Sequence, residues 1–314
     1  MYQLQASERF HHGQIVWVRA QQEILATLDD EGKLDGLPFM PEMSPYCGRS
    51  FRVSSIPTMT CVEGVGFRGL KDIIFLENLR CSGDAHDGCQ RDCLLFWREA
   101  WLSDHPVSQS PAPDTLAAPN NTQLKTKHGA RYFCQSTELS GVVTEFRPED
   151  SRPKGKLAIF KKIFRDLLHG EMTIAAFTKK IVSAFLNRLK ALLGMDTGGQ
   201  LTGQRQKTET LSLGLQPGEW IEIKSRKEIA ETLDSHGKNR GLLFDIPMGD
   251  YCGQRFQVEN QLRKIILEET GQMVTLTNTV LLKNNVCTAW GCPRANRFFW
   301  REIWLRRVEP GKDT

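Results

Sequence analysis

The heptapeptide FWREAWL at residues 96–102 recurs as FWREIWL at residues 299–305. Upstream of these heptapeptides, residues 13–53 align with residues 218–258 at a constant offset of 205 and without a gap. The aligned stretches share glycines, aromatic residues and a Tyr-Cys-Gly tripeptide at matching positions. Self-similarity of this density indicates an internal duplication, so we expect one small module to occur twice in the chain.

Each copy has the pattern of a β-rich module. Residues 14–19 and 219–224 alternate apolar and polar side chains and include β-branched residues, which predicts a strand in each copy. A short helical turn is predicted next, because QQEILATLD and RKEIAETLD space Ile and Leu four apart and are followed by Gly32 and Gly237. We expect further strands at residues 51–53, 256–258, 72–77 and 273–283, and over both heptapeptides.

The strand spacing predicts the fold class and the domain boundaries. Short strands with glycine-marked turns are typical of small barrels, and the opening Gly-x-x-Val-x-Val pattern resembles that of SH3-like barrels. We therefore predict a mainly β protein with a helical insert, in which two SH3-like small barrels are joined by a linker with two amphipathic helices. The predicted domains are residues 1–102, 103–212 and 213–314.

The tryptophans of the heptapeptides, Trp97 and Trp101 in one copy and Trp300 and Trp304 in the other, allow two interpretations. Side chains four residues apart lie on the same face of a strand. They either close the core as an aromatic pair or form an exposed surface that recognises peptides.

The predicted linker has two parts. Residues 103–128 are rich in Pro, Ser, Thr and Asn, which indicates a flexible connection. From residue 154 to residue 193 large apolar residues recur at helical spacing, which predicts two helices that are broken near Gly170.

These predicted helices are strongly basic. Their cationic residues are Lys154, Lys156, Lys161, Lys162, Arg165, Lys179, Lys180, Arg188 and Lys190. Such helices either pack on the barrels and leave a solvated basic face, or dock on an anionic membrane surface or an acidic partner.

Three thiols and one imidazole lie within the thirteen residues 81–93, in a loop rich in Gly and Asp. Thiolate sulfur and imidazole nitrogen are ligands that zinc prefers, and a loop allows several of them to converge. Two further cysteines, one upstream and one downstream, are available as a fourth thiolate. The predicted zinc ligands are Cys81, Cys89, Cys93, Cys61, His86 and Cys134.

Two alternatives for this loop stay open. An iron–sulfur cluster also takes four cysteine ligands, and the thiols could instead be reduced and metal-free. The second copy keeps Cys287 and Cys292, but its loop is shorter and Asn296 stands where Cys93 would fall. Two thiols do not make a closed zinc site, so we expect any metal in the first copy.

Composition narrows the class of protein. The chain is 40% hydrophobic and 25% charged, as ordinary globular proteins are. Its net charge of +4 is small for 314 residues and argues against a general nucleic-acid binder. No apolar signal segment and no run of 18 apolar residues is present, so we expect a cytoplasmic protein whose nine cysteines are thiols or metal ligands.

The phrases GLPFMPEMSPYCGRSFRV (36–53), YFCQSTEL (132–139) and FWREIWL (299–305) resemble those of uncharacterised bacterial proteins with tandem SH3-like, cysteine-rich modules. Such proteins are often encoded near polysaccharide or natural-product biosynthesis enzymes. The resemblance implies a bacterial cytosolic protein that is an accessory to a biosynthetic pathway. It implies no catalytic activity.

These observations favour a zinc-stabilised, non-catalytic adaptor or scaffold that binds a protein partner. The sequence contains no phosphate loop, Gly-x-Ser-x-Gly, His-Glu-x-x-His or dinucleotide motif, which argues against an enzyme. Two alternatives remain: an iron–sulfur or thiol-dependent enzyme or redox subunit, in which Cys93 or Cys134 could act as nucleophile, and a peripheral membrane protein that binds through the basic helices.

Overall fold

The computed structural model describes residues 9–107, 124–145, 182, 199–287 and 293–309. The chain divides into two units, each of which is mainly β with a few short helices. Unit 1 comprises residues 1–176, 266–274 and 291–294. Unit 2 comprises residues 177–265, 275–290 and 295–314. Unit 1 therefore includes two segments that belong to the second copy of the repeat.

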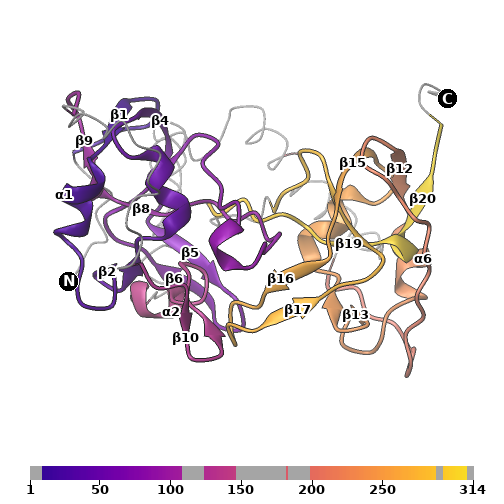
Figure 1. Ribbon diagram of the computed structural model, residues 1–314. Helices are drawn as coiled ribbons and strands as arrows, with labels where there is room; N and C mark the ends of the chain where they lie inside the picture. Colours follow the sequence, from indigo (N-terminus) through magenta and orange to yellow (C-terminus); the bar gives the residue numbers. More distant parts are fainter. Residues whose placement is uncertain (1–8, 108–123, 146–181, 183–198, 288–292, 310–314) are drawn as a thin grey trace, which may run out of the picture. The chain divides into compact units, whose positions relative to one another are not determined.

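Unit 1 contains an antiparallel sheet of five strands in the order β8-β7-β4-β1-β9. Figure 1 labels β8, β4, β1 and β9 of this sheet. The strands are β8 Trp97–Arg98, β7 Ile73–Leu76, β4 Ser50–Ser55, β1 Ile15–Val18 and β9 Leu102–Ser103. The alternation predicted for the first strand places Val16 and Val18 in the core, because successive side chains of a strand point to opposite faces.

Shorter elements complete unit 1. Before and around the sheet these are α1 Gln21–Leu25, β2 Lys33–Leu34, β3 Leu37–Pro38, η1 Pro41–Tyr46, β5 Met59–Val62, β6 Gly66–Gly69, η2 Asp84–His86 and η3 Glu99–Trp101. After the sheet follow β10 Lys127–His128, β11 Arg131–Tyr132 and α2 Leu139–Val142. Residues 266–274 belong to the hairpin of β16 Lys264–Ile266 and β17 Met273–Thr275.

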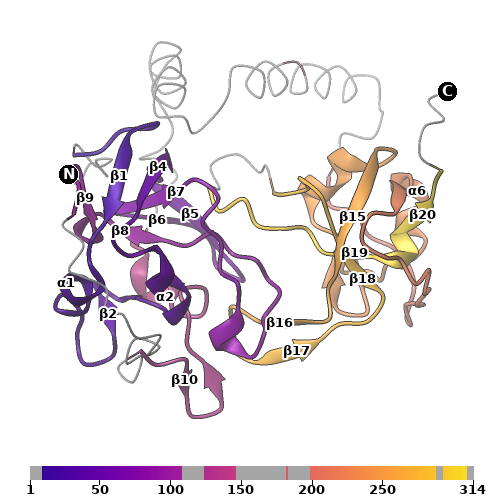
Figure 2. The ribbon, with the colours of Figure 1, turned by 45° about the horizontal axis from the view of Figure 1, so that its top comes forward.

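Unit 2 repeats the sheet of unit 1 in the order β19-β18-β15-β12-β20. Figure 2 labels β19, β18, β15 and β20 of this sheet. The strands are β19 Trp300–Arg301, β18 Thr279–Leu282, β15 Arg255–Gln261, β12 Trp220–Ile223 and β20 Leu305–Arg307. The shorter elements are α6 Arg226–Ala230, β13 Lys238–Asn239, β14 Leu242–Leu243, η5 Ile246–Tyr251 and η6 Glu302–Trp304.

The two sheets confirm the duplication. Their strands follow the chain in the same order, and the long central strands carry a bulge at matching positions, between Val53 and Ser55 and between Val258 and Asn260. Within the described residues each sheet ends in two edge strands and does not close on itself. The architecture is therefore two equivalent five-stranded antiparallel sheets.

The tryptophans of both heptapeptides lie in the core. All four are fully buried, which confirms the first of the two interpretations. The indole of Trp101 donates to Thr27 Oγ1 at 3.1 Å, and that of Trp304 donates to Thr232 Oγ1 at 3.0 Å. The prediction that each pair lies on one strand was wrong: a 3₁₀ turn, η3 or η6, follows the two strand residues of the heptapeptide.

Part of the predicted linker range is core structure of unit 1. Leu124, Phe133, Leu139 and Val142 are buried. We call residues 131–142 the strap, because this segment runs from β11 to α2 across the face formed by β3.

The two amphipathic helices predicted over residues 154–193 lie outside the described residues, apart from Val182. In the part of the chain that the structure describes, no helix is both long and apolar enough to cross a membrane.

Candidate functional site

Cys81 and Cys93 lie directly opposite each other where the loop after β7 begins and ends. An isolated antiparallel bridge joins Arg80 to Leu94, and the Cys81 N–H donates to the Cys93 carbonyl at 2.8 Å. Residues opposite each other in an antiparallel pair direct their side chains to the same face. Both sulfurs therefore start from the same side of the loop.

Cys89 is held by the backbone of the same loop. Gly83 has a positive φ of 74°, and a Cβ at this position would lie 2.0 Å from the Cys89 carbonyl oxygen. Only glycine allows this close approach. The Cys89 sulfur accepts a hydrogen bond from the Ile266 N–H at 3.3 Å, which fixes its position from a second segment of unit 1.

Cys134 comes from the strap. Its N–H donates to Thr137 Oγ1 at 3.0 Å. The next residue, Gln135, anchors the strap: its side-chain carbonyl accepts from the Phe96 N–H at 2.9 Å, and its amide donates to the Phe96 carbonyl at 2.8 Å. Gln135 is buried and donates also to the Pro38 carbonyl at 3.1 Å.

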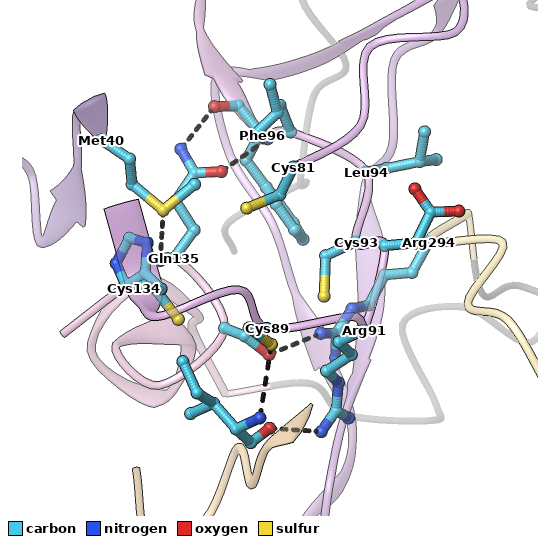
Figure 3. A pocket seen from close by; sticks show the side chains of 15 residues that line it. Met40, Cys81, Cys89, Arg91, Cys93, Leu94, Phe96, Cys134, Gln135 and Arg294 are labelled. Atoms are coloured by element: carbon cyan, nitrogen blue, oxygen red, sulfur yellow. Dashed lines mark hydrogen bonds between the residues drawn. The ribbon is translucent and has the colours of Figure 1, made fainter. Parts of the chain in front are cut away.

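The four cysteines line one small cavity (Figure 3). The side chains of Cys81, Cys89, Cys93 and Cys134 are four of the fifteen that line it, and its volume is about 30 Å³. One ordered water needs roughly 10–15 Å³. The cavity therefore has room for one ion or about two to three waters, whereas a [4Fe–4S] cluster has eight atoms.

The buried thiols are protonated at neutral pH. Burial raises the pKa of Cys81 and of Cys93, although the guanidinium groups of Arg91 and Arg294 act in the opposite direction on Cys93. Burial also raises the pKa of Cys134 to about 11. Because the thiolate is the reactive form, these thiols are poor nucleophiles, and a bound cation is needed to displace their protons.

Two arginines beside the cavity occupy the same position in the two copies. Arg91 and Arg294 are related by the offset of 203 that also relates the heptapeptides. Arg294 donates to the Cys61 carbonyl at 3.0 Å and pairs with Glu268 at 2.6 Å. The Arg91 guanidinium pairs with Glu63 at 2.9 Å.

The contacts of these arginines are reciprocal. Arg91 donates to the Ile266 carbonyl at 3.1 Å, and Ile266 is the counterpart of Cys61 at the offset of 205. Glu63 and Glu268 are also counterparts at this offset. Each arginine thus binds a main-chain carbonyl contributed by the other copy.

His86 has both ring nitrogens engaged. Nδ1 lies 2.5 Å from Glu42 Oε1, and Nε2 lies 2.9 Å from the Phe133 carbonyl oxygen. Burial disfavours the imidazolium, but the hydrogen bond and charge of Glu42 outweigh it and raise the pKa of His86. In this arrangement His86 joins η1 to the strap, and no ring nitrogen faces the cavity with a free lone pair.

Cys61 lies apart from the other predicted ligands. It is on β5, its carbonyl accepts from Arg294, and it is not among the residues that line the cavity. The structure thus brings four of the predicted cysteines together and assigns Cys61 to the arginine network.

The site fits zinc in donor type and in size. Four thiols are a donor set that structural zinc sites use, and the cavity has the volume for one ion. Among the described residues, no group of three or more His, Cys, Asp or Glu side chains is already arranged as a metal shell. Binding therefore requires the four cysteine side chains to turn toward a single ion.

The second copy retains the backbone of the site and one thiol of the opposed pair, Cys287. The Cys287 N–H donates to the Asn296 carbonyl at 2.7 Å, as Cys81 does to Cys93. Asn296 replaces the second thiol, and Pro247 stands at the position of Glu42. Cys292 lies outside the described residues.

Sequence reasoning missed the residues that build the site from a distance. These are Glu42, Arg91, Gln135, Glu268 and Arg294. Comparison of the two copies could have identified Arg91 and Arg294, because these two arginines occupy the same position in the repeat. No local pattern marks Gln135, whose partner is 39 residues away.

A scan against protein-family models, a search of curated proteins and a search of solved structures gave no match.

Proposed function

We propose that this protein is a non-catalytic adaptor whose first unit is stabilised by zinc and whose modules bind extended segments of protein. The observation that carries the proposal is the way unit 1 binds its own strap. Phe96 precedes the edge strand β8, and the Gln135 side chain pairs with both its N–H and its carbonyl. An added strand or peptide satisfies the same N–H and carbonyl groups of a sheet edge with its main chain, a role that the side-chain amide of Gln135 takes in unit 1.

The cysteine cavity supports the zinc part of the proposal. Zinc bound by Cys81, Cys89, Cys93 and Cys134 would cross-link the loop to the strap, which are distant in sequence. Arg91 and Arg294 supply positive charge beside Cys93, and this charge offsets part of the negative charge of a four-thiolate site. The zinc then has a structural role, since four protein ligands leave no open position for substrate.

The raised pKa values of the thiols favour this function over a thiol-dependent enzyme, and the small cavity favours a single ion over an iron–sulfur cluster. In the proposal the two modules are SH3-like. The resemblance to bacterial tandem-module proteins suggests a partner from a polysaccharide or natural-product pathway.

Elemental analysis of the purified full-length protein tests the zinc site. We expect about one zinc per chain in the wild type. The Cys93→Ser and Cys134→Ser variants should lose the metal. Cys47→Ser is the matched control, because Cys47 is a largely buried thiol that does not line the cavity. Cys61→Ser should likewise retain zinc.

Thermal unfolding with and without a chelator checks the structural role. We expect zinc removal to lower the melting temperature of the wild type and to leave that of Cys93→Ser unchanged. Wild-type protein without zinc, or zinc retained in both cavity variants, would contradict the proposal. Brown protein that contains iron would instead favour the iron–sulfur alternative.

A further inference from the structure

The strap covers a specific face of unit 1. This face consists of β3, the start of η1 and the residue before β8. Leu37 is 0% exposed, Phe96 is 2% exposed, and Pro38 is buried. The duplication places an equivalent face on unit 2, where no strap of the same sequence follows in the described residues.

Among the described residues, part of the equivalent face of unit 2 is exposed, beside the segment 200–209 that bonds to Asn239, Arg240 and Phe244. Leu243, the counterpart of Pro38, is 39% exposed, and Ile246 is 50% exposed. A glycine pair gives a direct comparison at identical backbone conformation, because Gly36 and Gly241 both have a φ of 81°. A Cβ on Gly36 would meet the Gly141 carbonyl of the strap at 2.8 Å, whereas a Cβ on Gly241 would meet nothing within 4 Å.

Polar groups on the face of unit 2 match those that the strap satisfies in unit 1. In unit 1 the Lys33 ammonium binds Glu138 of the strap at 3.0 Å. Its counterpart Lys238 is exposed and has no ion pair among the described residues. Likewise, no described side chain bonds to the backbone of Phe299, the counterpart of Phe96, which is only half-buried.

We propose that this open face of unit 2, formed by Lys238, Gly241, Leu243, Ile246 and Phe299, is the docking site for an extended segment of a partner protein. The inference rests on the proposed adaptor function and specifies its binding surface. The strap defines the chemistry of the segment: a glutamine that pairs with the Phe299 backbone, and an acidic residue three positions later for Lys238. The sequence Gln-x-x-Glu at 135–138 is the model for this spacing.

Charge complementarity and the apolar surface both support a partner segment as the occupant. Lys238 offers an exposed cation that interacts with Asp234 but forms no ion pair within 4 Å among the described residues, and Leu243 and Ile246 add exposed apolar surface. The chain's own strap is already committed to unit 1 through Gln135 and Glu138. An exposed sheet edge beside apolar side chains is a recurrent site for peptide addition.

Fluorescence anisotropy with the full-length protein tests the docking site. The probe is a labelled peptide with the sequence of residues 129–145, in which Cys134→Ser prevents oxidation. We expect saturable binding to the wild type. Lys238→Glu should weaken binding about fivefold, because it turns an attraction into a repulsion. Leu243→Asp should weaken binding about tenfold or more, because it removes apolar contact area.

Charge reversal separates recognition from misfolding. A peptide with Glu138→Lys should bind Lys238→Glu more tightly than it binds the wild type, which a structural defect would not produce. Lys227→Glu is the charge-matched control, since Lys227 is exposed on α6 outside the open face, and it should bind the original peptide as the wild type does.

Three outcomes would overturn the docking site: no peptide binding, binding that neither unit 2 substitution weakens, or concentration-dependent self-association that Leu243→Asp abolishes. The last outcome would make a second copy of the chain the occupant. Zinc content is measured in the same samples. A zinc-loaded protein that does not bind the peptide contradicts the docking site alone, whereas a zinc-free protein contradicts the zinc part of the adaptor proposal.

Discussion

The loop after β7 in the first copy and the loop after β18 in the second copy start and end on the same scaffold. Each begins with an N–H that donates across the loop, from Cys81 to Cys93 and from Cys287 to Asn296. Each has a residue with positive φ just before the closing position. The first loop places eleven residues between these ends, and the second places eight.

The difference shows that the sheet does not depend on the cysteine cluster. The second copy forms the same five-stranded sheet with one thiol of the opposed pair replaced by an amide. The first loop carries His86 and Cys89, which contact segments outside the sheet. The cluster therefore connects the module to other segments, in line with a cross-linking zinc.

The largest expected loss of stability is at the ion pair between Arg294 and Glu268, which lies beside the matching pair of Arg91 and Glu63. Arg294 and Glu268 are each only 3% exposed in their side chains. Arg294→Ala leaves the Glu268 carboxylate buried without its main partner, and loss of one member of a buried pair costs roughly 3–5 kcal/mol. We expect the free energy of unfolding, measured by urea denaturation, to fall by this amount.

The equivalent arginine in the other copy is the control. Arg91 pairs with the half-exposed Glu63 at 2.9 Å and only at 3.7 Å with the buried Glu268, so Arg91→Ala should cost roughly 1–3 kcal/mol. Equal losses in the two variants would show that burial of the carboxylate does not distinguish the two pairs. Arg205→Ala, in an exposed pair with Glu209, should cost less than about 1 kcal/mol.

The repeated sequence was enough to predict the strands of the sheet. It was not enough to predict the contacts that build the site. Strand positions followed from alternation in segments such as residues 14–19, because that pattern reflects one buried and one solvated face. The heptapeptide was predicted as one strand but contains a 3₁₀ turn. Periodicity does not encode this turn, which places Trp101 beside Thr27.

The cysteine cluster was only partly predictable for a related reason. Spacing identified the loop 81–93, but His86 and Cys61 bind groups that lie far away in sequence. The Arg294 contact with Cys61 spans 233 residues. Long-range partners of this kind leave no periodic or local signal, and only the match between the two copies hints at them.

A medium effect is expected for the anchor of the strap. Gln135→Ala removes the partner of the Phe96 N–H and carbonyl, and an unsatisfied buried polar group costs roughly 1–3 kcal/mol. Hydrogen exchange at the Phe96 amide should accelerate in this variant. Gln200→Ala is the matched change in unit 2, where the side chain donates to the Phe244 carbonyl and, in an exposed bond, to the Leu201 carbonyl, and it should cost less. Unchanged exchange at Phe96 would contradict the anchoring role of Gln135.

The smallest expected effect compares the helix caps of the two copies. Helix α6 begins after Ser225, whose Oγ accepts from the Glu228 N–H at 3.4 Å, while Glu228 accepts from the Ser225 N–H at 2.9 Å. Helix α1 begins after Ala20, which keeps only the reciprocal half of this box: the Ala20 N–H donates to Glu23 at 3.0 Å.

Exchange of the two cap residues should therefore have opposite effects. A serine, threonine or aspartate cap contributes roughly 0.5–2 kcal/mol relative to alanine, because its oxygen satisfies an amide at the helix start. Ser225→Ala should lower the free energy of unfolding by about 1 kcal/mol, and Ala20→Ser should raise it by about half that amount, since a five-residue helix gains little from its own cooperativity. Urea denaturation of both variants and of the double exchange measures the two effects together. If Ala20→Ser destabilises the protein, the start of α1 does not have the geometry of its counterpart, and the equivalence of the two modules ends at this turn.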